Sequence, residues 1–191
     1  MASVLFVCTG NICRSPIAEG VFRDLMAGTG VQADVASAGI VGWDGSSAVD
    51  EAVRAAAELG SDISGHRARR LETSHVEGTD LVVCMAGEHR DAVARLAPGA
   101  ASRTFTLKEL VRLMEELPSP EPGDGPIDRV RAADELRRSG FEGQPHDEDV
   151  SDPIGMSMDT FRAVAGDFDA WCARLAAGLM GTRVAAGDRE S

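Results

Sequence analysis

The stretch SVLFVCTGNICRSPIAEG, residues 3–20, decides the fold of this chain. It begins with an apolar, β-branched and aromatic run at residues 3–7, which is typical of a buried strand. From residue 16 to residue 27 the apolar side chains recur at the spacing of one helix face. The sequence therefore predicts a strand, a short loop over residues 8–15 and then a helix.

The rest of the chain alternates between strand-like and helix-like segments. The strand-like runs cover residues 33–39, 80–85 and 102–107, and the helix-like runs cover 47–60, 88–96, 108–117 and 159–179. Such alternation predicts a parallel sheet with helices on both faces. We expect a small, doubly wound, three-layer α/β domain with four parallel strands, in which ligands bind beyond the carboxyl ends of the strands. The loop between the first strand and the first helix lies at such an end.

One stretch, residues 118–150, departs from this pattern. It begins with the Pro/Gly-rich PSPEPGDGP and ends in an acidic segment, with room for one short amphipathic helix between them. We interpret the chain as a single domain over residues 1–182, with 118–150 as an insertion and 183–191 as a flexible tail.

Composition narrows the function classes. The 191 residues carry a formal net charge of −12, which argues against a nucleic-acid partner, because such proteins need a basic surface. No apolar stretch is long enough to span a bilayer and no secretory signal is visible, so we expect a cytoplasmic protein without a membrane partner. Its four cysteines are too unevenly spaced for a disulfide framework, which agrees with that location.

The potential metal ligands do not cluster in the sequence. His75, His89 and His146 have no partners at metal-ligand spacing, so we expect them to be surface residues. Cys84 and Cys172 are expected in the core. The sequence thus predicts no metal site and no cofactor.

Cys8 and Arg14 frame a C-x5-R motif whose residues suit a bound phosphoryl group. Gly10 permits backbone conformations in which successive N–H groups point at an anion. Ser15 and Pro16 are expected as the N-cap and first residue of the following helix, whose amino end attracts anions. Arg14 can bind two phosphoryl oxygens, and the Cys8 thiol is expected to ionise in this positive field and act as a nucleophile.

Phosphoryl transfer also needs a general acid for the leaving group. The candidate is Asp152 in VSDPIGMS, where Pro153 stiffens a loop just before the last helix. An isolated Asp-Pro pair is more often only a turn, so this interpretation depends on the nucleophile loop that Asp152 would serve.

The motif VLFVCTGNICRSPIAE, with the downstream DP at 152–153, resembles the low-molecular-weight protein tyrosine phosphatases. The likeness extends over nearly the whole chain apart from 118–150 and the tail. It continues through SAG (37–39), GHRARRL (65–71), DLVVCM (80–85) and FTLKEL (105–110).

The resemblance implies a role for each matching residue. Cys8 would form a cysteinyl-phosphate, Arg14 would clamp the phosphoryl group, and Asp152 would protonate the leaving group and then activate water. The residues implied in phosphate or substrate binding are Thr9, Gly10, Asn11, Ile12, Cys13, Arg14, Ser15 and the rim aromatic Trp43.

Further positions match supporting features of the family. Asn11, Ser15, Ser37 and His66 correspond to a polar network that holds the loop. Cys13 corresponds to the residue that forms a reversible, protective disulfide with the nucleophile. The resemblance implies no metal.

The substrate is left open by departures from the family pattern. Ile154 and Gly155 follow Asp152 and Pro153 where many members carry aromatic residues, and this form is similar to a bacterial branch that includes protein arginine phosphatases. In that branch a threonine tends to occupy the position of Ile12, so Ile12 favours phosphotyrosine instead. We therefore expect a protein-tyrosine phosphatase that releases inorganic phosphate, with a phosphoarginine protein or a small phosphate ester as the alternative substrate.

Two other functions fit the same loop less well. Arsenate reduction needs a cysteine relay, but Cys84 has no close downstream cysteine and Cys172 lies far along the chain. A non-catalytic phosphate-binding module would need neither a nucleophile nor an acid, whereas Cys8 and Asp152 supply both.

Overall fold

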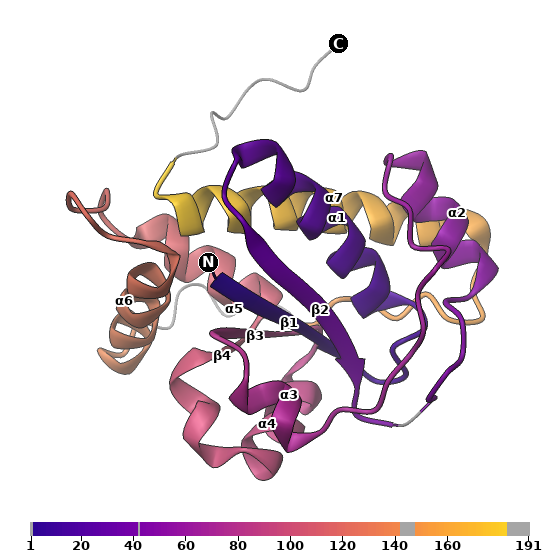
Figure 1. The fold of residues 1–191 in the computed structure, drawn as a ribbon, viewed down its shortest axis with the longest axis horizontal. Helices are drawn as coiled ribbons and strands as arrows, with labels where there is room; N and C mark the ends of the chain where they lie inside the picture. The colour runs from indigo at the N-terminus through magenta and orange to yellow at the C-terminus, as the bar shows by residue number, and fades with distance from the viewer. Residues whose placement is uncertain (1, 42, 142–147, 183–191) are drawn as a thin grey trace.

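The computed structural model shows a three-layer α/β fold (Figure 1). It describes residues 2–41, 43–141 and 148–182. The four strands are β1 (Ala2–Cys8), β2 (Ala33–Gly39), β3 (Leu81–Cys84) and β4 (Thr104–Thr106). They form one sheet in the order β2-β1-β3-β4, and every pair is parallel. The predicted four-stranded parallel sheet is therefore confirmed.

Helices cover both faces of this sheet, as Figure 1 shows. One layer is built by α1 (Arg14–Thr29), α2 (Asp50–Glu58), α5 (Leu107–Glu116) and α7 (Met158–Met180), with α6 (Pro126–Arg138) packed against α5 and α7 at its edge. The other layer holds α3 (Thr73–Glu77), α4 (Gly87–Leu96) and the short 3-10 helix η1 (Pro98–Arg103).

The alternation of side chains along β1 produces the two cores. Val4 and Phe6 belong to the cluster beneath α1 and α7, whereas Leu5 and Val7 belong to the cluster beneath α4. Successive strand side chains point to opposite faces, and a strand covered on both faces is apolar throughout. This is why residues 4–7 show no polar alternation.

The helix expected between the two ends of the 118–150 stretch is α6, and it contributes to the main core. Val130 and Ala133 are buried within the cluster that includes α5 and α7. The buried Arg129 donates hydrogen bonds to the carbonyl oxygens of Gly178 (3.0 Å), Met114 (3.3 Å) and Pro118 (2.5 Å). This part of the stretch is therefore fixed to the domain, whereas residues 142–147 and the expected tail lie outside the described residues.

The topology brings two loops to the same edge of the sheet. β1 and β3 are adjacent and parallel, so the loop after β1 and the first turn of α4 after β3 leave the sheet at neighbouring carboxyl ends. The Met85 N–H donates to the Val7 carbonyl (2.9 Å), so the pairing of β1 with β3 extends to the carboxyl ends of both strands. Strand order reverses here, which is where ligands bind in open α/β sheets. None of the described helices has the length and apolar character needed to cross a membrane.

Candidate active site

The sulfur of Cys8 lies within the loop that joins β1 to α1. Cys8 is 2% exposed, and its Sγ accepts the backbone N–H of Asn11 (3.3 Å). The Ser15 hydroxyl lies 2.9 Å from the same sulfur. Both groups can donate a hydrogen bond to a thiolate, so the loop surrounds the sulfur with donors that suit a negative charge.

Asn11 supports the loop through its backbone and its side chain. Its φ of 57° lies in the left-handed region, which asparagine enters more readily than most residues. The side-chain amide donates to Ser15 Oγ (2.9 Å) and Ser37 Oγ (2.7 Å), and its oxygen accepts the Arg69 N–H (2.9 Å). His66 Nε2 donates to the Asn11 carbonyl (2.8 Å). The structure thus brings Asn11, Ser15, Ser37 and His66 together, as the resemblance implied.

Glu19 joins this network without having been predicted. Its Oε2 accepts the Ser37 hydroxyl (2.5 Å) and lies 4.0 Å from His66 Nδ1. Glu19 lies on α1, one turn beyond the phosphate-binding motif, and nothing in its local sequence distinguishes it from a surface carboxylate. Its partners come from β2 and from the segment before α3, so only the fold reveals the contact.

One local prediction for the loop is wrong. Helix α1 begins at Arg14 after Cys13, so Ser15 is inside the first turn and does not cap the helix, because its hydroxyl contacts Cys8 instead. Positive φ occurs at Asn11 and not at Gly10. Gly10 is needed for space, since a Cβ there would lie 3.1 Å from Trp43 Cδ1.

Arg14 links the loop to the segment that carries Asp152. The Arg14 side chain is 7% exposed, and its Nη2 forms an ion pair with Asp152 Oδ2 (2.5 Å) and donates to Thr9 Oγ1 (3.0 Å). Its Nη1 donates to the Val150 carbonyl (3.3 Å). Asp152 is more exposed, at 38%, and its Oδ1 accepts the Ile154 N–H (3.2 Å). The nucleophile, clamp and acid that the sequence predicted therefore lie at one place.

These residues line a cavity of about 170 Å³. Its lining comprises Cys8, Thr9, Gly10, Ile12, Cys13, Arg14, Trp43, Asp152 and Ile154. Trp43 and Ile154 are about half exposed, at 50% and 47%, and Ile12 is buried at 7%. Most residues predicted to bind substrate thus line a single, largely apolar cavity. Asn11 and Ser15 do not line it and instead form hydrogen bonds within the loop.

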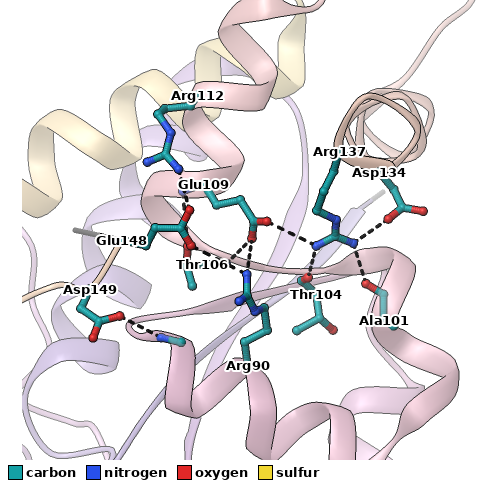
Figure 2. A network of polar contacts seen from close by, with 11 residues as sticks. Arg90, Ala101, Thr104, Thr106, Glu109, Arg112, Asp134, Arg137, Glu148 and Asp149 are labelled. Atoms are coloured by element: carbon teal, nitrogen blue, oxygen red, sulfur yellow. Dashed lines mark hydrogen bonds and ion pairs between the residues drawn. The ribbon is translucent and has the colours of Figure 1, made fainter. Parts of the chain in front are cut away.

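The segment leading to Asp152 is fixed to three elements, and Figure 2 shows the contacts of Glu148 and Asp149. Glu148 Oε1 accepts a hydrogen bond from Arg112 on α5 (2.6 Å). Asp149 Oδ1 accepts the Gly87 N–H at the start of α4 (2.8 Å). The Val150 N–H donates to the carbonyl oxygen of Met85 at the end of β3 (2.7 Å). This segment therefore has a defined path along the carboxyl edge of the sheet.

The same network reaches α6, the helix within the predicted insertion. Arg90 Nη1 lies 3.2 Å from Glu109 and 3.7 Å from Glu148 (Figure 2). Glu109 also lies 3.7 Å from Arg137 of α6, which is paired with Asp134. Glu109 thus links α4, α5 and α6 beside the segment that carries Asp152.

Cys13 is buried beside Cys8, and both line the cavity. Burial raises the pKa of the Cys13 thiol, and the nearby Asp152 carboxylate raises it further. Cys84 and Cys172 lie in the core as predicted, and burial raises the pKa of each. All four cysteines are free thiols in this structure.

His89 is the main site residue that the sequence analysis missed. We predicted a surface histidine, but His89 is fully buried in the first turn of α4 with its Nε2 3.0 Å from Thr9 Oγ1. Its position just after the strand at 80–85 could have indicated a site residue, because ligands bind beyond the carboxyl ends of such strands. His75 is half-buried, and its Nδ1 accepts the Glu72 N–H (3.2 Å), while His146 lies outside the described residues.

The surroundings of His89 favour a neutral imidazole. Burial lowers the pKa of His89 to about 4, and the Arg14 cation acts in the same direction. The carboxylates of Asp149 and Asp152 oppose this shift. A third carboxylate, that of Glu88, has its Oε1 3.4 Å from Nε2.

Replacing His89 with glutamine is expected to weaken the pH dependence of the free energy of unfolding. Between the ordinary pKa of 6.5 and the folded value of about 4, the unfolded imidazole binds a proton and the buried one does not. The wild type therefore loses about 1.4 kcal/mol of stability per pH unit from this group as the pH falls through that window. Denaturant unfolding of both proteins near pH 7 and near pH 5 measures the difference, and equal pH slopes would contradict the lowered pKa.

Comparisons with known proteins agree with this geometry. The family model for "Low molecular weight phosphotyrosine protein phosphatase" matches residues 3–139. A protein-arginine-phosphatase from Geobacillus stearothermophilus is 37% identical over 134 residues, which cover 70% of this chain and 87% of that protein. The low molecular weight protein-tyrosine-phosphatase Etp of Escherichia coli K12 is 36% identical over 118 residues, which cover 62% of this chain and 76% of Etp.

Solved structures give the same result for the fold. A YwlE mutant from Bacillus subtilis aligns with a TM-score of 0.74 at 26% identity, over 94% of this chain and 99% of that one. The low molecular weight protein tyrosine phosphatase from T. tengcongensis aligns with a TM-score of 0.70 at 34% identity, over 92% and 97% of the two chains. The sequence comparisons and the structural comparisons therefore point to the same family. The chain belongs to the low molecular weight phosphotyrosine protein phosphatase family, and it is a cysteine-dependent phosphatase.

Proposed function

We propose that this enzyme hydrolyses phosphotyrosine in proteins through a phosphorylated Cys8. The observation that carries the proposal is the cavity at Cys8, which Arg14 and Asp152 share with the apolar side chains of Ile12 and Trp43. An aromatic ring buries well against apolar walls, with a few polar groups fixing its orientation. Apart from Asp152, the described lining holds no carboxylate that could pair with a charged guanidinium group.

In the first step, the Cys8 thiolate attacks phosphorus and the bond to the tyrosine oxygen breaks. Arg14 and the loop N–H groups bind the phosphoryl oxygens, where negative charge spreads in the transition state. A phosphoryl dianion displaces Asp152 from Arg14, and the released carboxylate takes up a proton from solvent. The Asp152 carboxyl group then gives this proton to the leaving oxygen, which keeps the electron pair of the broken P–O bond and departs as a neutral phenol.

In the second step, the Asp152 carboxylate takes a proton from water, which attacks phosphorus and breaks the S–P bond. Inorganic phosphate leaves and the Cys8 thiolate is restored. We assign Asn11 and its hydrogen-bond partners to holding the loop during both steps, because the Asn11 N–H contacts Cys8 Sγ directly. Cys13 serves as the partner for a reversible disulfide with Cys8, and the four free cysteines suit a reducing, cytoplasmic setting.

Phosphoarginine is the second candidate substrate, and one observation favours it. Ile154 stands at the cavity where an aromatic side chain would flank a phenyl ring, and Gly155 follows it with a φ of 76°. Among the relatives, the one from Geobacillus stearothermophilus is named a protein-arginine-phosphatase. The aliphatic wall is open enough for the flexible chain of an arginine.

Phosphate release from one peptide carrying either phosphotyrosine or phosphoarginine tests the proposal. We expect a higher kcat/KM for phosphotyrosine, and Ile12→Thr should lower it by about tenfold because it replaces an apolar contact with a hydroxyl group. Ile127→Thr on α6 is the control, because Ile127 does not line the cavity.

A preference of the wild type for phosphoarginine would replace the first candidate with the second. Hydrolysis of small phosphate esters together with inactivity on both peptides would exclude a protein substrate.

A further inference from the structure

We propose that His89 is a positioning residue for the phosphate clamp and that it acts through the hydroxyl group of Thr9. The inference rests on the phosphatase function proposed above for Cys8 and Arg14. It concerns the orientation of the Arg14 guanidinium group, which must present two N–H groups to a phosphoryl group.

Most partners of Arg14 lie on one segment of the chain. Its Nη1 contacts the Val150 carbonyl and its Nη2 contacts Asp152, and both partners lie on the segment that carries the acid. Among the hydrogen bonds of Arg14 in the described part of the chain, only that to Thr9 Oγ1 (3.0 Å) comes from elsewhere. When Asp152 turns to the leaving group, Thr9 is the side chain that still fixes Nη2.

The Thr9 hydroxyl group lies between Arg14 and His89. A guanidinium group can only donate, so Thr9 Oγ1 accepts the bond from Arg14. The same oxygen lies 3.0 Å from His89 Nε2, to which it can donate its proton or from which it can accept a second bond. In either tautomer, His89 holds Thr9 Oγ1 in place and leaves a lone pair facing Arg14.

A histidine occupies this buried place at a cost in free energy. Within the described residues, His89 Nδ1 is the buried side-chain nitrogen or oxygen atom that lacks a hydrogen-bond partner. Such an atom costs free energy, and a phenylalanine ring would fill a similar space without that cost. A histidine is favoured here if its other nitrogen makes a useful hydrogen bond. That nitrogen, Nε2, lies 3.0 Å from Thr9 Oγ1, with the exposed Glu88 carboxylate farther away at 3.4 Å. The lowered pKa keeps the ring neutral, so it adds no second cation beside Arg14.

The location of His89 in the fold connects the clamp with the acid segment. His89 lies in the first turn of α4, whose Gly87 N–H also holds Asp149 (2.8 Å). One helix end therefore supports Arg14 through Thr9 and supports the acid segment through Asp149. This arrangement sets the clamp and the acid relative to each other.

The test measures the dissociation constant for inorganic phosphate by calorimetry, together with kcat/KM for a phosphotyrosine peptide. We expect His89→Phe and Thr9→Val each to weaken phosphate binding and to lower kcat/KM on the order of tenfold, because each removes a hydrogen bond next to a charged group. The double variant should be no worse than Thr9→Val alone, since His89 acts through Thr9. Alkylation of Cys8 by iodoacetamide, which needs no anion clamp, should keep its wild-type rate.

Amide substitutions provide the rescue experiment. A glutamine at position 89 can place its amide near the site of Nε2, whereas an asparagine reaches only the site of Nδ1. We therefore expect His89→Gln to retain phosphate affinity and His89→Asn to lose it, also if His89→Phe fails to fold. His75→Phe on α3 is the control for replacing a histidine away from the cavity.

Three results would overturn the inference. They are wild-type phosphate affinity in a folded His89→Phe protein, losses that multiply in the double variant, and equal affinities of the asparagine and glutamine variants. A wild-type protein without turnover would instead refute the proposed function. Calorimetry with inorganic phosphate would still report on the Arg14 clamp in that case.

Discussion

Replacing Cys8 with serine is expected to abolish phosphate release while leaving phosphate binding nearly intact. A serine hydroxyl group is not ionised at neutral pH, and the groups that contact this position, the Asn11 N–H and the Ser15 hydroxyl, are not bases that could activate it, so the phosphoenzyme does not form. We expect a loss in kcat of about 10⁴-fold or more. The Arg14 side chain and the loop N–H groups remain, so the dissociation constant for inorganic phosphate should change by only a few-fold.

The measurement combines phosphate release from a phosphotyrosine peptide with calorimetry on the same protein. Cys172→Ser on α7 is the matched control, because that cysteine is buried away from the cavity. Turnover that survives in Cys8→Ser but disappears in Cys13→Ser would move the nucleophile to Cys13. The structure argues against that result, because burial and the Asp152 carboxylate raise the pKa of the Cys13 thiol.

Much of the fold follows from local patterns in the sequence. The runs that predicted the strands overlap β1 to β4, although the run at 102–107 extends into η1 and α5. The central strands β1 and β3 were recognisable because strands buried on both faces are nearly continuous apolar runs. The short helix α3 and the 3-10 helix η1 were not predicted, since each has too few residues for a helical period to be recognised.

Site residues that belong to one continuous sequence motif could be predicted, whereas residues whose partners are far away in the sequence could not. Cys8 and Arg14 share one loop, and Asp152 was found only because that loop requires an acid. Glu19 and His89 were missed because their partners lie 18 and 80 residues away in the sequence. Histidine is more often a surface residue, so the burial of His89 could not be predicted from its residue type. Its contact with Thr9 is visible only once α4 is packed against the loop.

Asp152→Asn is expected to slow hydrolysis by a factor that depends on the leaving group. Asparagine keeps the shape of the side chain but cannot transfer a proton, so kcat for a phosphotyrosine peptide should fall by about 10²- to 10⁴-fold. With 4-nitrophenyl phosphate the leaving oxygen is less basic and needs less protonation, so the loss in the first step should be much smaller. Phosphate affinity should not fall, because the substitution removes the carboxylate that competes for Arg14.

Comparing the two substrates separates acid catalysis from a structural effect. Single-turnover formation of the phosphoenzyme isolates the first step, and Asp159→Asn, an exposed carboxylate paired with Arg162, is the control. An equal loss of this rate for both substrates would mean that Asp152 positions the loop and transfers no proton. A loss confined to the peptide would establish proton transfer, because folding and phosphate binding affect both substrates alike. That result would also show that the Arg14–Asp152 ion pair opens when substrate binds, since a carboxyl group held by Arg14 cannot reach the leaving oxygen.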